Sequence, residues 1–237
     1  MTMTRELVYG RNAARELVRG PRRVLEVWVT ERASSQIPWL DSGPRPLVKP
    51  ERVLSEEAGT RDHQGVVAWC EPFRYADAYD LAKRETPLLV CLDQVTDPHN
   101  LGAVVRSAEG AGASGVVITE RNSARVTPAV SKASAGATEH IPVALVVNLS
   151  RYLEEIKGPQ LWVWAAAEDA ETPVWSADLT TGVGLVLGTE GKGLRPGVRR
   201  VCDDAFAVPL AGSIESLNVS VAAGIALFEA ARQRRGA

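Results

Sequence analysis

The sequence predicts an α/β protein, and three observations support this fold class. Apolar runs of strand length alternate with amphipathic or alanine-rich segments of helix length along the whole chain. From Pro87 onward these runs are apolar throughout, as parallel strands covered on both faces are. The composition is globular, because 45% of the 237 residues are hydrophobic and 24% are charged. With no low-complexity tract or heptad repeat, fibrous, coiled-coil and disordered classes are excluded.

The first part of the chain is predicted to hold two helices and two strands. The helices span Arg5–Arg19 and Pro50–Ala58, and the strands span Val24–Val29 and Gly65–Trp69. The stretch Pro72–Pro87 is polar and begins and ends in proline, so we interpret it as a linker with room for a short helix. We therefore expect a small domain over residues 1–72, a linker over residues 73–86 and a larger domain over residues 87–237.

The larger domain is predicted to contain a parallel sheet of fully buried strands. The predicted strands are Leu88–Leu92, Gly115–Ile118, Pro142–Val147, Leu161–Ala165, Gly184–Leu187 and Phe206–Val208. The helices between them are predicted at Asn100–Gly110, Pro128–Thr138, Ser150–Ile156 and Pro196–Val201.

The chain closes with its longest predicted helix, Ser216–Arg234. Within it Leu217, Val221, Ile225 and Phe228 recur at helical spacing. We therefore expect these four side chains to face the core.

Membrane spans, cysteine content and charge narrow the class of protein but do not identify its partner. No apolar stretch approaches the ~18–20 residues that a bilayer crossing needs, and the N-terminus lacks the apolar region of a secretory signal. We therefore expect a cytoplasmic protein that does not span a membrane. Cys70, Cys91 and Cys202 are odd in number and lie among apolar neighbours, which predicts reduced thiols. The formal net charge is −2, yet residues 1–30 hold six Arg against three Glu. Arginine suits phosphate, although biased codon usage gives the same excess, so charge permits RNA binding without indicating it.

Familiar nucleotide and metal motifs are absent on inspection. Gly110-Ala-Gly112-Ala-Ser-Gly115 has dinucleotide-loop spacing but ends a predicted helix instead of opening one, so a tight helix-to-strand turn is the better interpretation. In the stretch Gly188–Gly193, Lys192 is followed by glycine instead of Ser or Thr, so it is not a phosphate loop of the P-loop enzymes. The three histidines are scattered, and we expect no metal site.

Polar residues follow a predicted buried strand in the stretch 93–107. Asn100 can cap the helix that follows, and Arg106 lies near the start of that helix among small apolar residues, where it can meet an anion. The alternative is a surface arginine paired with Glu109.

Two further polar segments follow later strands. Glycines 188, 191 and 193 let backbone groups approach a ligand, or they form a tight turn only. Ser216 and Asn218 begin the last helix, where capping is the plain explanation, although a cap needs only one such residue. Ligands gather at the carboxyl ends of parallel strands, so the three segments are expected to converge.

The ordered set of these residues resembles a known family. Asn100-x5-Arg106, Gly188-x-Glu190-Gly-x-Gly193 and Pro209-x-x-Gly212-x3-Ser216-Leu-Asn218-Val-Ser220 are similar to the three motifs of the SpoU/TrmH family of S-adenosylmethionine-dependent RNA 2′-O-ribose methyltransferases, within the SPOUT class. The stretches Leu7–Asn12 and His63–Val67 resemble the small ribosomal-protein-L30e-like α/β domain that precedes the catalytic domain in the 23S rRNA guanosine methyltransferase branch. The sequence carries Glu215 in the variable stretch of the third motif, which adds negative charge.

The resemblance implies a fold, a cofactor and partners. It implies a SPOUT catalytic domain with a parallel sheet and a C-terminal trefoil knot, a homodimer, and methylation of RNA, with a guanosine of 23S rRNA as the expected target and tRNA as the alternative. S-adenosyl-L-methionine would be the cofactor, with neither metal nor redox group needed and no DNA partner expected. Gly188, Val208 and Leu217 would contact the cofactor. The catalytic and RNA-positioning set would be Asn100, Arg106, Glu190, Ser216 and Asn218.

The implied mechanism gives Arg106 a part in removing the proton of the 2′-hydroxyl. A guanidinium keeps its proton above pH ~12, so we favour the hypothesis that Arg106 binds the adjacent phosphate or polarises the hydroxyl while a phosphate oxygen or water takes the proton. In this hypothesis Ser216 and Asn218 orient the ribose or the cofactor, and Glu190 fixes the loop or Arg106. In the first domain the candidate RNA contacts are Tyr9, Arg11, Arg15, Arg22 and Arg23.

Two other functions stay open at this point. A nucleotide-binding Rossmann enzyme is disfavoured by the context of Gly110–Gly115. A non-catalytic RNA-binding or assembly protein on the same scaffold is disfavoured by the presence of Arg106, Glu190 and Asn218.

Overall fold

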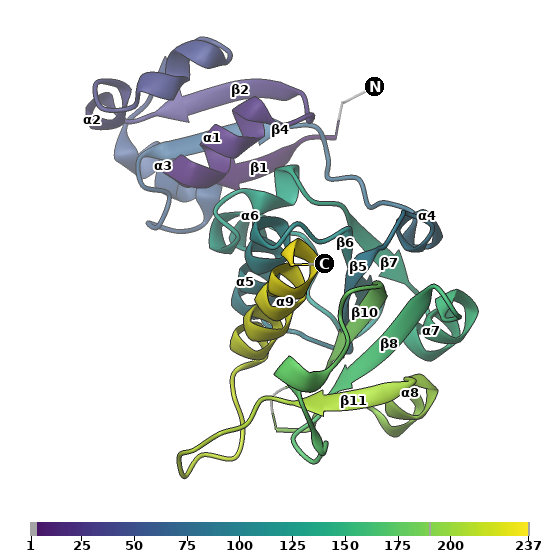
Figure 1. Cartoon of the computed structure of the whole chain (residues 1–237). Coiled ribbons are helices and arrows are strands. Elements are labelled where there is room, and N and C mark those ends of the chain that lie inside the picture. Colours follow the sequence, from purple (N-terminus) through teal and green to yellow (C-terminus); the bar gives the residue numbers. More distant parts are fainter. Residues whose placement is uncertain (1–3, 190, 237) are drawn as a thin grey trace. The chain divides into compact units, whose positions relative to one another are not determined.

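The computed structural model describes residues 4–189 and 191–236, which fold into two compact units (Figure 1). The first unit contains residues 4–74 together with residues 125–140, and the second contains the remaining described residues. Residues 125–140 are expected from the sequence in the larger domain, whereas in the structure they pack within the first unit. The reason is a set of contacts with the start of the chain, because α6 (Pro128–Ala133) packs against β1 (Glu6–Tyr9).

The first unit is built on a four-stranded sheet in the order β1-β4-β2-β3. Strands β1, β4 (Val66–Cys70) and β2 (Val24–Val29) pair antiparallel, and the two-residue β3 (Leu47–Val48) joins β2 in parallel. The remaining elements are α1 (Arg11–Arg19), α2 (Glu31–Ser34), η1 (Pro38–Ser42), α3 (Glu51–Ala58) and η2 (Ala137–Glu139). A core of small and branched side chains from β1, β2, β4 and α1 fills one face of the sheet.

Two predicted helices of the first unit are shorter than expected. The predicted helix Arg5–Arg19 divides at Gly10 (φ 96°) into strand β1 and helix α1, and Val8 of that strand pairs with Ala68 of β4. Strand pairing and burial of Val8 therefore override the helical pattern over residues 6–9. The predicted helix Pro128–Thr138 ends at Ala133, because Ala135 and Gly136 both take positive φ values.

The second unit contains a seven-stranded sheet in which every pair is parallel, as the sequence predicts. The order is β7-β6-β5-β10-β8-β11-β9, so strand β10 lies between β5 and β8. The strands are β5 (Leu88–Leu92), β6 (Gly115–Thr119), β7 (Val143–Val146), β8 (Leu161–Ala166), β9 (Thr172–Pro173), β10 (Gly182–Leu187) and β11 (Asp204–Ala207). All residues of β5, β6 and β10 are buried, which explains why their sequences are apolar throughout.

The helices of the second unit lie close to where the sequence predicts them, except for the short η3, which was not predicted. They are α4 (Ala78–Ala82) in the predicted linker, α5 (Pro98–Gly110), α7 (Leu149–Ile156), the short η3 (Val174–Ser176), α8 (Pro196–Val201) and α9 (Val219–Arg235). Helices α5 and α9 pack side by side (Figure 1). Within the described residues, none of the helices combines the length and apolar character that a membrane crossing requires.

The core face of α9 differs from the predicted one. The buried residues are Val219, Ala223, Ala226, Leu227 and Ala230. Of the four residues expected in the core, Val221 is 48% exposed and Phe228 is 53% exposed, while Leu217 and Ile225 are half-buried. Small alanine side chains allow α9 to approach its neighbours closely, and this leaves Val221 and Phe228 on the outer face.

Candidate active site

Two predicted site residues that are 118 positions apart meet in the second unit. The Asn218 side-chain nitrogen donates a hydrogen bond of 2.9 Å to the Asn100 side-chain oxygen. Asn100 lies in the first turn of α5, just after β5, and Asn218 lies just before α9. The first and third polar segments therefore come together at the carboxyl ends of the parallel strands.

Helix α5 begins three residues earlier than a cap at Asn100 requires. Asp97 is the capping residue, because its carboxylate accepts a hydrogen bond of 2.9 Å from the His99 amide and Pro98 occupies the first helical position. The expectation that Asn100 caps this helix is therefore wrong, and its carboxamide is turned to Asn218 instead. Arg106 is exposed on the same helix, and the ion pair with Glu109 that would explain it is absent among the described residues.

Asn218 performs two tasks at once. Its side-chain oxygen accepts hydrogen bonds from the Ser220 amide at 2.9 Å and from the Ser220 hydroxyl at 2.6 Å, which caps α9. Its side-chain nitrogen is thereby directed to Asn100. Ser216 lies in the exposed loop before the helix and is not needed for the cap.

The glycine-rich stretch after β10 is a closed turn. Thr189 and Gly193 exchange two backbone hydrogen bonds of 2.9 and 3.2 Å. A Cβ atom on Gly188 would lie 2.1 Å from the carbonyl carbon and oxygen of Gly193, so only glycine fits at this position. Gly191 and Gly193 take φ values of 75° and 61°. Glu190, predicted to fix this loop or Arg106, lies outside the described residues.

A cavity of about 470 Å³ opens beside this turn. All three predicted cofactor residues, Gly188, Val208 and Leu217, line it, and so does Ser216. The charged residues among its described lining are Glu168, Glu171 and Glu215, with no Lys or Arg. The cavity has the size of a small-molecule site and favours a ligand that carries positive charge.

The buried Asp93 beside the site was not predicted from the sequence. It is 1% exposed and directly follows β5, and its carboxylate accepts hydrogen bonds from Arg195, two residues after the glycine-rich turn. The only sequence signal was an acidic residue that ends an apolar strand.

The cysteines offer no nucleophile near this site. All three are free thiols, as predicted. Burial raises the pKa of Cys70 to about 11 and that of Cys202 to about 12, and it also raises the pKa of Cys91.

Comparison with known proteins decides the family. Residues 87–228 match the SpoU rRNA Methylase family, and residues 7–76 match the domain described as RNA 2′-O ribose methyltransferase substrate binding. The chain belongs to the SpoU rRNA methylase family. The resemblance found in the sequence is thus confirmed for both parts of the chain.

Relatives of this SpoU protein match over nearly its whole length. The 23S rRNA (guanosine-2′-O-)-methyltransferase RlmB of Shewanella oneidensis is 39% identical and covers 97% of this chain and 98% of its own length. The enzyme of the same name from Pseudomonas syringae pv. tomato is 42% identical, with 97% and 96% covered. Among solved structures, the SpoU methyltransferase AviRb from Streptomyces viridochromogenes, in complex with the cofactor AdoMet, has a TM-score of 0.83 at 26% identity and covers 98% of this chain and 92% of its own.

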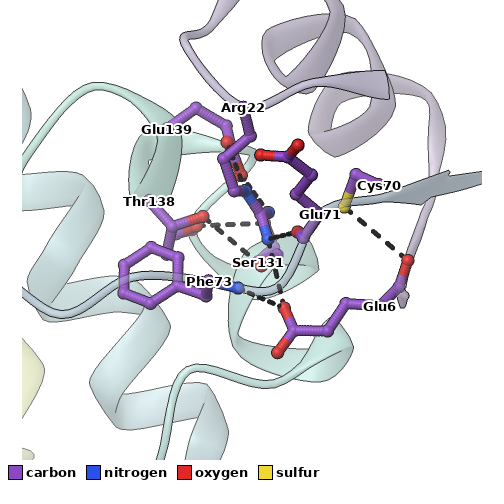
Figure 2. Close-up of polar contacts among 9 residues, drawn as sticks. Glu6, Arg22, Cys70, Glu71, Phe73, Ser131, Thr138 and Glu139 are labelled. Carbon is purple, nitrogen blue, oxygen red and sulfur yellow. Dashed lines mark hydrogen bonds and ion pairs between the residues drawn. The ribbon is translucent and has the colours of Figure 1, made fainter. Parts of the chain in front are cut away.

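The SpoU substrate-binding part carries one of its candidate arginines in a buried network. Figure 2 shows Arg22 between Glu139, Glu6 and Glu71. The Arg22 side chain is 11% exposed, and its Nε donates a hydrogen bond of 2.9 Å to the Glu139 carboxylate, which is 1% exposed. Burial acts to lower the pKa of the Arg22 guanidinium. The hydrogen bond to Glu139 and the negative charge of that carboxylate outweigh burial, so the pKa is raised. Arg22 therefore supports the fold of this unit and is removed from the candidate RNA contacts.

The remaining candidates in this part of the SpoU chain are more accessible. Arg23 is exposed, Tyr9 and Arg15 are half-buried, and Arg11 donates hydrogen bonds to the Gln64 carbonyl at 3.1 Å and the Gln36 side chain at 3.3 Å. Residues 1–74 and 125–140 together hold 14 Lys and Arg against 11 Asp and Glu, a net charge of +3. The rest of the chain carries 13 against 18, a net charge of −5.

Proposed function

We propose that this chain transfers the methyl group of S-adenosyl-L-methionine to the ribose 2′-oxygen of a guanosine in 23S rRNA. The observation that carries the proposal is the acidic, glycine-walled cavity of the second unit, adjoining segments that meet through Asn100 and Asn218. The relatives that match nearly the whole chain bear the name of this activity, and they support the choice of substrate.

The residues present fit the cofactor. S-adenosylmethionine carries a sulfonium and an ammonium group, and Glu168, Glu171 and Glu215 attract positive charge at the cavity. A dinucleotide would bring a negatively charged pyrophosphate to the same carboxylates, so the cavity disfavours the Rossmann alternative. We infer that the backbone of Gly188, Val208 and Leu217 holds the cofactor, because all three residues line the cavity.

The bound cofactor would supply an electrophilic methyl group on a good leaving group, a positively charged sulfur. The ribose oxygen forms the new C–O bond as the S–CH₃ bond breaks, and the bonding electron pair remains on sulfur. The protein must therefore align the 2′-oxygen and allow its proton to leave, and alignment alone contributes about 7–11 kcal/mol.

Arg106 is assigned to the RNA. Its exposed guanidinium lies on the helix that begins at the site, and no carboxylate neutralises it among the described residues. We infer that it binds the phosphate beside the target ribose or polarises the 2′-hydroxyl, while a phosphate oxygen or water accepts the proton. Asn218 and Ser216 orient the ribose or the cofactor, and Glu190 keeps its proposed role of fixing the loop or Arg106.

Arg106 variants test the mechanism. For Arg106→Ala we expect kcat to fall by a factor on the order of 10²–10³ with cofactor affinity unchanged, as for loss of one stabilising donor. Arg106→Lys separates two explanations, because charge alone predicts substantial activity and a need for the planar fork predicts near-complete loss. An Arg106→Ala variant with the wild-type rate would refute this assignment.

RNA binding is assigned mainly to the first unit. Its charge of +3 contrasts with −5 for the rest of the chain, and its accessible candidate contacts are Tyr9, Arg11, Arg15 and Arg23. Positive charge supplies affinity for the phosphate backbone, and single-stranded RNA loops offer bases and 2′-hydroxyls for recognition.

A homodimer is part of the proposal. Val221, Ile225 and Phe228 stand one helical turn apart on α9, and two of them are about half exposed. An exposed apolar stripe of this kind suits a second copy of the same helix. Phe228→Glu is expected to shift the protein from dimer to monomer in analytical ultracentrifugation, and an unchanged mass would reject this surface. The trefoil knot implied by the family also stays a proposal.

The function itself is tested by mapping ribose methylation. Purified protein, S-adenosylmethionine and unmethylated 23S rRNA are incubated, and 2′-O-methyl sites are located by reverse-transcription stops at low nucleotide concentration. We expect a new stop at one guanosine that is much weaker with Arg106→Ala after the same time of incubation. Methylation of tRNA alone would favour the other substrate, and binding of RNA without methyl transfer would indicate a non-catalytic protein.

A further inference from the structure

The pair formed by Asp93 and Arg195 joins two of the three segments of the candidate site. One Asp93 carboxylate oxygen accepts a hydrogen bond of 3.0 Å from the Arg195 amide, and the other lies 2.8 Å from Nε and 2.7 Å from a terminal nitrogen of the guanidinium. The Asp93 amide donates to the Leu187 carbonyl at 2.8 Å. Asp93 thus contacts both sides of the glycine-rich turn, at Leu187 just before it and at Arg195 two residues after it.

Among its described residues, the turn between these two points has few other contacts that fix its position. Its two backbone hydrogen bonds join Thr189 and Gly193 to each other, which closes the turn but does not attach it to the sheet. Gly191, Lys192 and Gly193 are exposed, and Leu194 is the partly buried residue that packs on the core. Attachment of the turn therefore depends on Leu194 and on the carboxylate of Asp93.

The chemistry of the pair suits positioning better than simple stabilisation. The Asp93 carboxylate is buried and the Arg195 side chain is 46% exposed, and an apolar contact of similar volume would often hold the two segments together as firmly as such an ion pair does. A carboxylate that binds one backbone amide and two guanidinium nitrogens also fixes distance and angle. Asp93 opens the segment that carries Asn100 and Arg106, so this geometry links that segment to the cavity wall at Gly188.

We propose that Asp93 and Arg195 are positioning residues that hold the glycine-rich turn in the shape that binds the cofactor. The inference rests on the proposed function, because it takes the cavity beside Gly188 as the S-adenosylmethionine site. Neither side chain lines the cavity, so both act through the turn.

The test uses Arg195→Lys and Asp93→Asn, with Arg200→Lys as the matched control. Lysine keeps the charge but loses the fork, and asparagine keeps the shape but loses the charge. Arg200 is exposed on α8, the helix that begins just after Arg195, and has the same substitution. For the two test variants we expect the Kd of S-adenosylmethionine in calorimetry to rise about tenfold, the effect of losing one hydrogen bond to a charged group. We expect kcat at saturating cofactor and the affinity for RNA to stay at wild-type values, and Arg200→Lys to behave as wild type.

Three outcomes would overturn the inference. These are a wild-type Kd in both test variants, a fall in kcat with unchanged Kd, and an equal loss of cofactor affinity in Arg200→Lys. If Asp93→Asn does not fold, Arg195→Lys decides, because its side chain is 46% exposed and its replacement keeps a positive charge near Asp93.

A second measurement separates this inference from the proposed function. Hydrogen exchange in the cofactor-free protein should be faster over residues 188–195 in both test variants than in wild type or Arg200→Lys. If wild-type protein binds no S-adenosylmethionine, the proposed function fails while faster exchange still supports the structural role of the pair. Unchanged exchange together with normal cofactor binding in the variants would reject the positioning role of Asp93 and Arg195 and leave the proposed function intact.

Discussion

The interiors of the two units are stabilised by different kinds of contact. In the second unit three central strands are buried over their full length and are almost entirely apolar. The first unit is smaller, yet among the described residues it holds five of the seven buried polar or charged side chains, including His63 and Glu139. Apolar packing tolerates small shifts, whereas buried charges and hydrogen bonds require matched partners.

The two units therefore differ in where their polar groups lie. The polar interior of the first unit ties residues 125–140 to the start of the chain through Arg22–Glu139 and through Lys132, whose ammonium lies 3.4 Å from the Asp62 carboxylate. The apolar interior of the second unit leaves its polar groups at the carboxyl ends of the strands, where the cavity lies. A substitution in the interior of one unit should therefore destabilise that unit and leave the stability of the other unchanged.

The largest expected effect follows from breaking the Arg22 network. Arg22→Ala leaves the Glu139 carboxylate buried without its cation, and loss of one partner from a buried ion pair costs about 3–5 kcal/mol. Hydrogen exchange followed by mass spectrometry should show faster exchange in β1, β4 and η2, with unchanged protection of β5 and β6. S-adenosylmethionine should bind as it does to wild type.

Arg52→Ala is the matched control for that variant. Arg52 forms an exposed ion pair with Glu56 one helical turn away in the same unit, and such pairs contribute about 0.3–0.5 kcal/mol. Equal destabilisation by Arg22→Ala and Arg52→Ala would show that burial of the Arg22 network adds nothing to the stability of the first unit.

A smaller effect is expected from Arg234 in the second unit. Its guanidinium donates to the carbonyl groups of Leu179 at 3.0 Å, Thr86 at 2.9 Å and Pro87 at 3.2 Å, and also to that of Thr181. Burial lowers the pKa of this arginine. Arg234→Ala should lower the free energy of unfolding by about 2 kcal/mol, because hydrogen bonds to a charged group are lost while the carbonyls can bind water. Faster exchange should appear at the end of α9 and the start of β5, and the first unit should keep its protection.

The fold was predictable where one physical signal dominates. Continuous apolar runs located β5, β6 and β10 closely, because strands buried on both faces have no polar position. The two-residue strands β3 and β9 carry no periodicity and were not predicted. The core face of α9 was wrong because hydropathy gives weight to large side chains, whereas close packing favoured Ala223, Ala226 and Ala230.

The candidate site was predictable to the extent that it follows from sheet topology. The contact of Asn100 with Asn218 follows from the rule that loops after parallel strands share one edge of the sheet. The pairing of Asp93 with Arg195, 102 residues apart, was not predictable, because an aspartate after a strand is a common turn residue. Only the coordinates distinguish a buried acceptor from a solvated turn.

The smallest expected effect is a pH dependence confined to the first unit. His63 is 1% exposed, its Nδ1 accepts a hydrogen bond of 3.0 Å from the Gly65 amide, and its Nε2 lies 2.9 Å from the Ser55 hydroxyl. Burial lowers the pKa of His63, and the nearby Lys132 lowers it further, although Glu51 acts in the opposite direction. The unfolded chain therefore binds a proton at a higher pH than the folded protein does. The stability due to neutral His63 is complete above pH ~6.5, and it declines as the pH falls below that value until the lower folded pKa is reached.

His63→Asn provides the comparison that isolates this effect. Its side-chain oxygen can accept the hydrogen bond from Gly65 but does not titrate. The variant should therefore keep the local structure around Gly65 and lose the dependence of stability on pH. Denaturation followed between pH 7 and 5 should show a decline in wild type of no more than about 1.4 kcal/mol per pH unit, the limit for one group. Exchange in β5 and β6 should not share this slope. If stability still declined with falling pH in His63→Asn, the pH dependence would belong to other groups. The buried His63 would then not distinguish the polar interior of the first unit from the apolar interior of the second.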